Sequence, residues 1–174
     1  MKRGIVFSAV CLAVILLAWT DLDLAASRQE QGDKQFIMKA AQSNIAEIAA
    51  GKMALSKATS ADVKKFGQMM VDDHTRALKE LDSIVRANKG PALPAEPDPA
   101  HKQAAKEMEA LSGKSFDAAY ISSQLKDHKE AIALFEKESS TGTDAAVKSY
   151  AIKTLPHLRM HLEHAQSIAS TVSK

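Results

Sequence analysis

The chain has 174 residues, of which 45% are hydrophobic and 25% charged, values that are ordinary for one globular domain. Its formal net charge of +2, without any basic block, argues against a nucleic-acid partner. The low content of glycine and proline, seven and five residues, beside abundant alanine, lysine and glutamate favours helices over sheets.

Residues 1–27 have the layout of a secretory signal peptide, which predicts export to the periplasm. A short basic start precedes a nearly unbroken apolar run from Gly4 to Trp19, and small residues lead to Ser27. The run has about 16 residues, which is short for a membrane-spanning helix, although an uncleaved anchor remains the alternative. The only cysteine, Cys11, lies inside this segment, so the mature protein would have neither a disulfide nor a thiolate metal site.

We interpret residues 28–32 as a polar linker and residues 33–174 as one helical domain. Apolar residues at helical spacing predict four long helices, at residues 33–57, 61–88, 115–139 and 143–174. Asp33 is expected to cap the first helix and Ser60 the second, because short polar side chains accept hydrogen bonds from the first turn of a helix. Pro156 lies inside the fourth pattern, which continues on both sides and therefore indicates one kinked helix.

The connection between the second and third long helices, residues 90–114, is too long for a tight turn. It begins with a proline-rich stretch, residues 91–99, after which a short helix through Leu111 is expected to lie across one end of the domain. The sequence contains no strand signal. It predicts an all-α protein, a four-helix bundle with a crossover segment that carries a short extra helix.

Three of the four long helices place a histidine on or beside their apolar stripe, namely His74, His128 and His161. A buried imidazole needs a partner, because an unpaired buried polar group is costly. The first helix offers Glu47 and Asn44. Side chains from facing helices converge in this way at metal sites inside bundles, so we expect a shared polar site in the core.

Two interpretations of this site stay open. In the first, a transition-metal ion such as zinc, iron or copper binds there, since neutral imidazole suits these metals and carboxylates compensate their charge. The candidate ligands are His74, His128, His161, Glu47, Glu136 and Asp73. In the second, the histidines pair with Asp73 and Glu136 in a hydrogen-bonded network that holds the helices in register. His157 and His164 either extend the site or, as we favour, lie in solvent, as does His101.

Several short motifs surround these histidines. Residues 66–74 read FGQMMVDDH, residues 116–120 read FDAAY, and residues 153–158 read KTLPHL, with His161 and Leu162 shortly after. With Phe36, Glu47, Asp127-His128 and Ala133-Leu134-Phe135-Glu136, this pattern resembles the exported bacterial proteins of the domain of unknown function 4142. The resemblance covers roughly residues 33–170.

The resemblance implies a ferritin-like four-helix bundle with no settled activity. Proteins of this family are often labelled as outer-membrane proteins, so association with the outer membrane is an alternative to a free periplasmic location. The wider ferritin-like class holds two irons with glutamates and Glu-x-x-His motifs. This sequence contains no Glu-x-x-His motif, so we expect neither ferroxidase nor oxygenase chemistry.

The leading hypothesis is therefore metal handling or envelope stress protection by an exported bundle that binds a transition metal. The alternative is a non-catalytic structural or interaction protein of the envelope. We do not expect an enzyme; redox or peroxide-related activity is a third hypothesis, which requires a redox-active metal with an open coordination position. Each long amphipathic helix is needed for the core, so none is left over to bind a membrane, and a homo-oligomer remains open.

Overall fold

The computed structural model describes the backbone of residues 10–172 and the side chains of residue 27 and residues 30–172. This part of the chain contains no strand, and its helices are α1 (Val10–Lys57), α2 (Ala61–Ala87), α3 (Pro99–Glu109), α4 (Gly113–Thr141) and α5 (Ala145–Val172). The predicted all-α, ferritin-like bundle of four long helices with an extra helix in the crossover is thereby confirmed.

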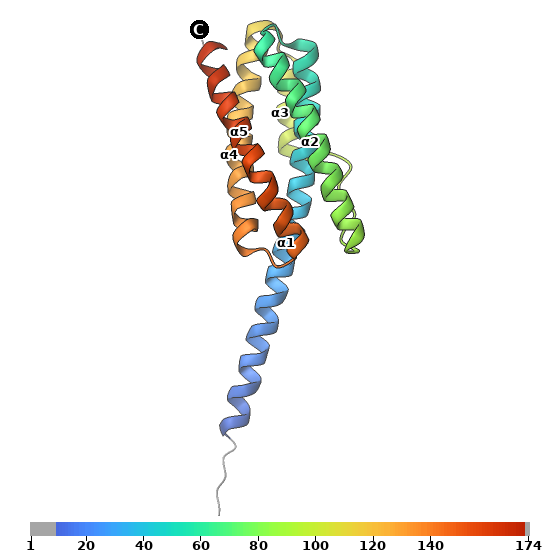
Figure 1. Ribbon diagram of the computed structural model, residues 1–174, viewed down its shortest axis with the longest axis vertical. Helices are drawn as coiled ribbons and strands as arrows, with labels where there is room; N and C mark the ends of the chain where they lie inside the picture. The colour runs from blue at the N-terminus through green and yellow to red at the C-terminus, as the bar shows by residue number, and fades with distance from the viewer. Residues whose placement is uncertain (1–9, 173–174) are drawn as a thin grey trace, which may run out of the picture.

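The four long helices form two hairpins, α1–α2 and α4–α5, which pack against each other through α1 with α4 and α2 with α5 (Figure 1). The crossover between α2 and α4 returns the chain to the opposite end of the bundle, so each long helix runs antiparallel to its neighbours. Close packing within the first hairpin depends on glycine, because a Cβ atom on Gly51 would lie 2.6 Å from the carbonyl oxygen of Gly67.

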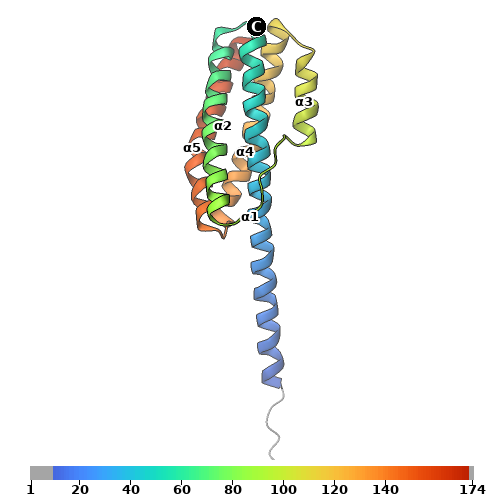
Figure 2. The ribbon, with the colours of Figure 1, turned by 90° about the vertical axis from the view of Figure 1, so that its right-hand side faces the viewer.

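The crossover helix α3 lies along the side of the bundle, against α1 and α4, and not across its end as predicted (Figure 2). Its N-cap is Asp98, whose carboxylate accepts hydrogen bonds from the backbone N–H groups of Ala100 and His101. Met108 is buried and joins the core, and Lys57 donates hydrogen bonds to the carbonyl groups of Glu109, which ends the helix, and Leu111. These contacts fix α3 against the side of α1.

Asp33 does not begin the first helix, because α1 starts at Val10. Its carboxylate instead accepts hydrogen bonds from the Thr143 N–H and hydroxyl groups and from the Asp144 N–H group, at 2.6–3.2 Å. Asp33 therefore closes the turn that leads into α5. The prediction that Asp33 caps the first helix is wrong, and the side chain that accepts hydrogen bonds from the first turn of α5 is that of Asp144.

Asp117, near the start of α4, does the same for the turn that leads into α2. It accepts hydrogen bonds from the Thr59 N–H and hydroxyl groups and from the Ser60 N–H group, at 2.7–3.3 Å. Ser60 is also the predicted N-cap of α2. Each hairpin turn is thus held by an aspartate of the other hairpin, and this exchange sets the register of the two hairpins.

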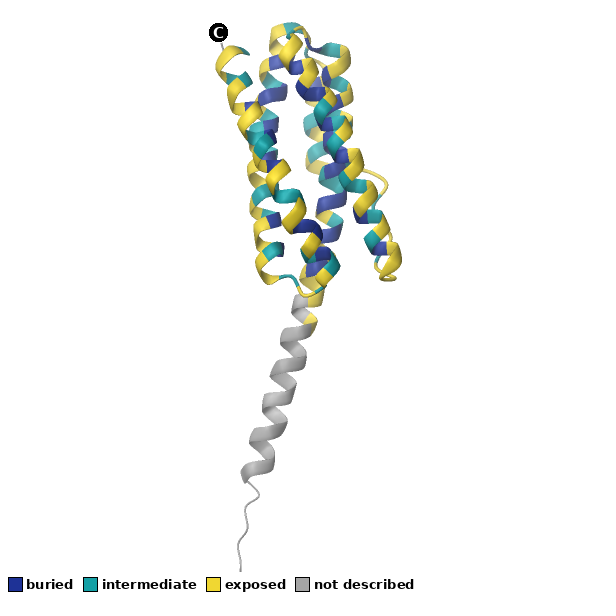
Figure 3. Cartoon of the chain, viewed as in Figure 1, coloured by how far each residue is buried: buried dark blue, intermediate teal, exposed yellow. Residues whose placement is uncertain are grey.

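Figure 3 shows that the buried positions of the long helices face the inside of the bundle, where the buried apolar residues form two clusters. One is centred on Phe36, Phe135 and Tyr150, and the other on Phe66 and Tyr120. The polar side chains that face the interior between them come from all four long helices, namely Asn44 and Glu47, His74, Gln124 and His128, and His161. The core therefore contains a polar layer between two apolar layers.

The helix α5 continues through Pro156, as the sequence predicts. Among the helices searched within the described residues, none is both long and apolar enough to cross a membrane. Residues 1–9 of the predicted signal peptide lie outside the described residues, and most of its remaining side chains are not described either. The boundaries at residues 27 and 32 therefore stay predictions.

Candidate metal centre

The three core histidines meet in the polar layer. His74 of α2, His128 of α4 and His161 of α5 are 5%, 1% and 1% exposed, respectively. One nitrogen of each ring lies within 4.8 Å of the corresponding nitrogens of the other two. The ring centroids are 5.3–5.8 Å apart. Their helices come from both hairpins, so the site exists only when the hairpins are packed together.

The outward nitrogen of His74 is held by an amide. Its Nδ1 atom lies 2.8 Å from Oδ1 of Asn44, whose amide nitrogen in turn donates to the Tyr150 hydroxyl group. An amide oxygen can only accept, so His74 Nδ1 carries the proton. The other nitrogen, Nε2, is then a bare lone pair, and it is buried without a hydrogen-bond partner.

The other two histidines are oriented in the same manner. His128 Nδ1 lies 3.0 Å from the backbone carbonyl oxygen of Gln124 and donates its proton there. His161 Nε2 donates to Oδ2 of Asp73 at 2.9 Å. The nitrogens that remain, Nε2 of His128 and Nδ1 of His161, carry lone pairs and lie 3.3 Å apart. Outer partners of this kind fix the tautomer of metal-binding histidines.

Burial keeps these imidazoles neutral. It lowers the pKa of His74 well below the ordinary value of 6.5, and the two neighbouring histidines lower it further. Burial lowers the pKa of His128 to about 4, and it does the same for His161 despite the opposing effect of Asp73. At neutral pH the three inward nitrogens are therefore free of protons and available as metal ligands.

Glu47 lies behind His128, away from the inward lone pairs. Its Oε2 atom accepts a hydrogen bond of 2.7 Å from the side chain of Gln124, and its Oε1 atom is 3.8 Å from Nδ1 of His128. Burial raises the pKa of this carboxyl group to about 7. Glu47 thus lies next to the cluster as an outer neighbour of His128.

The remaining carboxylate candidates occupy different places. Asp73 contacts the cluster through the outward nitrogen of His161 and also pairs with Arg76. The structure does not bring Glu136 to the cluster, because its carboxylate pairs with Arg159 at 2.7 Å and both side chains are more than half exposed. Asp73 would support a ligand, whereas Glu136 would stabilise the surface between α4 and α5.

Sequence reasoning missed two partners of the cluster. Gln124 supplies a carbonyl group to His128 and an amide to Glu47, and Tyr150 contacts Asn44. Gln124 precedes His128 by one helical turn, and this spacing was the available signal. The contact of Tyr150 with Asn44 connects residues 106 positions apart and has no local signature.

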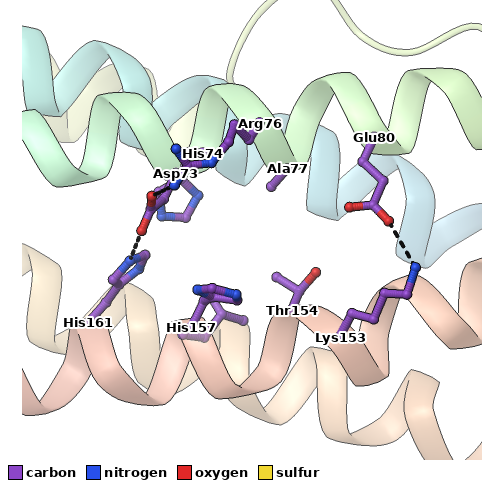
Figure 4. A pocket seen from close by; sticks show the side chains of 10 residues that line it. Asp73, His74, Arg76, Ala77, Glu80, Lys153, Thr154, His157 and His161 are labelled. Carbon is purple, nitrogen blue, oxygen red and sulfur yellow. Dashed lines mark hydrogen bonds and ion pairs between the residues drawn. The ribbon is translucent and has the colours of Figure 1, made fainter.

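A cavity of about 290 Å³ between α2 and α5 reaches the cluster (Figure 4). Asp73, His74 and Ala77 line it from α2, and His157 and His161 line it from α5. His157 is exposed, as favoured from the sequence. His164 is also exposed and lines a separate cavity farther along the same face, whereas His101 is partly buried and pairs with Asp98 on α3.

The fold and the site together define the class of protein, an all-α four-helix bundle with a buried cluster of three neutral histidines. The sequence assigns the chain to a narrower group, a protein family. Residues 21–168 match the family described as domain of unknown function (DUF4142), and the chain belongs to this family. Among curated proteins, none is similar enough in sequence to count as a relative.

Several solved structures share the fold. A secreted protein DUF305 from Streptomyces coelicolor, so described, superposes with a TM-score of 0.70 at 9% identity, over 82% of this chain and 94% of that chain. CopM in the Cu(II)-bound form gives a TM-score of 0.68 at 17% identity, and CopM in the Ag-bound form gives 0.66 at 18%. Both CopM comparisons cover 80% of this chain and 96% of the other.

Proposed function

We propose that the protein binds one transition-metal ion in the polar layer, through Nε2 of His74, Nε2 of His128 and Nδ1 of His161. The observation that carries this proposal is the set of three inward lone pairs that face one another without a donor. Buried acceptors without a donor destabilise a fold. A cation bound between the three nitrogens removes that cost. The lowered pKa values of the three imidazoles disfavour a proton in this role.

Copper is the metal that we propose first. Imidazole nitrogen suits copper and zinc, whereas magnesium, calcium and manganese prefer oxygen ligands. The three nitrogens are neutral, and no carboxylate is directed at the space between them, so imidazole alone supplies the ligands of the proposed site. The Cu(II)-bound and Ag-bound forms of CopM, which shares the fold, support the same choice.

The role that fits such a site is capture of copper outside the cytoplasm, as metal handling or protection of the envelope. The predicted signal peptide supports export, and the fold is shared with a protein described as secreted. We propose the periplasm as the location, with association with the outer membrane as the alternative. No catalytic step is part of this proposal.

The test is a metal titration of the protein purified after export, without a histidine tag. One equivalent of copper is expected to bind, and the His74→Ala and His128→Ala variants are expected to lose it. His164→Ala is the matched control, because this histidine is exposed outside the cluster. Equal copper content in wild type and His128→Ala, with both proteins folded, would overturn the site.

A structural role for the histidines is the second candidate. It is favoured by the contacts His74–Asn44–Tyr150 and His161–Asp73, which connect α2 with α1 and α5. On this hypothesis, added copper or zinc leaves the thermal midpoint unchanged, and chelators do the same. The network leaves Nε2 of His74 without a partner, which makes it the weaker explanation of the geometry.

A further inference from the structure

The cavity between α2 and α5 connects the histidine cluster with solvent. His74 and His161 line its inner part, and the unpartnered Nε2 atom belongs to a residue of this wall. Figure 4 shows Asp73 and His161 at one end of the cavity and the pair Glu80–Lys153 at the other, with His157 and Thr154 between them. The two helices that form the walls belong to different hairpins.

The opposite side of the cluster is much narrower. The cavity behind His128, lined by Glu47, Gln124 and Asp127, has a volume of about 30 Å³. This is far less room for a metal ion that still carries several waters than the α2–α5 cavity offers. The cavity of about 290 Å³ is also lined by His74 and His161, whereas none of the three histidines lines the small cavity, so the α2–α5 side is favoured.

His157 is the side chain on this route that is suited to meet a metal ion. It precedes His161 by one helical turn, a spacing that places two side chains on the same face of a helix. Among the described side chains it has no hydrogen-bond or ion-pair partner, so its imidazole is available. Figure 4 shows the His157 and His161 side chains at neighbouring places on α5, and both line the same cavity.

The charges along the cavity do not oppose a cation. Asp73 is paired with Arg76, and Glu80 lies 3.6 Å from Lys153 across the two helices. Both positive groups are thus offset by carboxylates that line the same cavity. Asp73 lies at the inner end, where it touches His161, so negative charge is closest to the cluster itself.

We propose that the metal ion reaches the cluster through the α2–α5 cavity and that His157 is its outer, transient ligand. This inference rests on the proposed function. The ion arrives as a hydrated or weakly chelated transition-metal cation, and the His157 imidazole replaces one of its waters. The ion then exchanges His157 for the inward nitrogens of His161, His74 and His128. Each step replaces one neutral ligand by another, without oxidation or reduction.

A transient ligand has a kinetic signature that a structural residue lacks. His157 is absent from the final complex, so its loss changes the barrier and leaves the bound state unaltered. His157→Ala is expected to lower the rate constants for binding and release by the same factor, about tenfold, which corresponds to about 1.4 kcal/mol of the barrier. The dissociation constant stays unchanged. Removal of the side chain also widens the cavity. If the cavity acted only as a steric passage, His157→Ala would therefore not slow copper binding.

The experiment is stopped-flow binding of copper(II) ion, supplied as its glycine complex, to the full protein after export. Wild type, His157→Ala, His157→Glu and His164→Ala are compared, with the dissociation constant measured separately by competition. We expect His157→Ala to bind copper more slowly than wild type and His157→Glu to recover part of the binding rate through its carboxylate. His164→Ala is expected to bind at the wild-type rate. Both surface histidines are exposed, so the variants are expected to fold.

Three other outcomes overturn the inference in distinguishable ways. If wild type binds no copper, the proposed function fails and the route fails with it. If all variants bind at wild-type rates, the function stands and His157 has no part in loading. If His157→Ala releases copper faster and binds it more weakly, His157 is a permanent ligand and not a transient one.

The route is tested independently of His157 by narrowing each cavity. Ala77→Leu adds bulk to the α2 wall of the large cavity, and Ala104→Leu adds the same bulk beside the small cavity at α3. Slower copper binding is expected only for Ala77→Leu. Slower binding only for Ala104→Leu would place the entrance on the opposite side and overturn the proposed route.

Discussion

Nε2 of His128 and Nδ1 of His161 face each other at 3.3 Å, and each ring donates its proton outward, to a carbonyl group and to a carboxylate. Two lone pairs at this distance do not attract each other. The arrangement becomes favourable when a positive ion lies between them and the third nitrogen of His74. The outer hydrogen bonds therefore prepare the rings for a cation before it arrives.

A metal that binds only the folded protein raises its stability. At a copper concentration of 100 times the dissociation constant, the expected gain is about 2.7 kcal/mol. Calorimetry with and without copper measures this as a higher thermal midpoint. His74→Ala is expected to abolish the shift, and His164→Ala to retain it. A shift of equal size in His74→Ala would contradict the ligand assignment.

Asp73 is expected to control affinity without touching the metal. Its carboxylate fixes the tautomer of His161, so Asp73→Asn is expected to weaken copper binding about 10- to 100-fold, by analogy with other outer partners. Competition with a chromophoric chelator measures the dissociation constant. The adjacent Asp72 is exposed and accepts from Gln68, so Asp72→Asn is the matched control. Equal dissociation constants for the two variants would show that Asp73 does not contribute to copper binding.

The sequence predicted the helices well because their apolar periodicity and caps are local signals. It also predicted which three histidines face the core, since each falls on the stripe of its own helix. The outer partners are different. Whether Glu47 or Glu136 lies beside a histidine depends on how the helices rotate against one another, and Glu136 turned instead toward Arg159. The contact of Asp33 with the turn before α5 spans 110 positions and has no local sequence signal.

The two aspartates between the hairpins are expected to matter for folding stability. Asp117 accepts hydrogen bonds from two backbone N–H groups and one hydroxyl group of the α1–α2 turn, and its removal leaves these donors without a partner. Asp117→Ala is expected to lower the free energy of unfolding by about 2 kcal/mol. Urea denaturation measures the difference. Glu163→Ala, at an exposed position of α5, serves as control and is expected to change it by less than about 0.5 kcal/mol.

Glu138 gives the α4–α5 turn a dependence on pH. Its carboxyl group is buried and shares a hydrogen bond with Asp33. Burial, reinforced by the nearby negative charges of Asp33 and Asp144 and opposed by Lys148, raises its pKa from 4.5 to about 7. The folded state therefore holds this proton more tightly than the unfolded state does. The stability that the proton provides is complete below pH 4.5 and is lost as the pH rises through about 7.

Glu138→Gln replaces the protonated acid by an amide, which keeps a donor toward Asp33 at every pH. Urea denaturation at pH 5 and pH 8 is expected to show wild type losing stability relative to this variant as the pH rises. The pKa of Asp33 is lowered from 3.8, so its own titration falls below this window and does not mask the effect. Parallel pH profiles for the two proteins would show that Glu138 is ionised in the fold throughout, with Asp33 holding the turn alone.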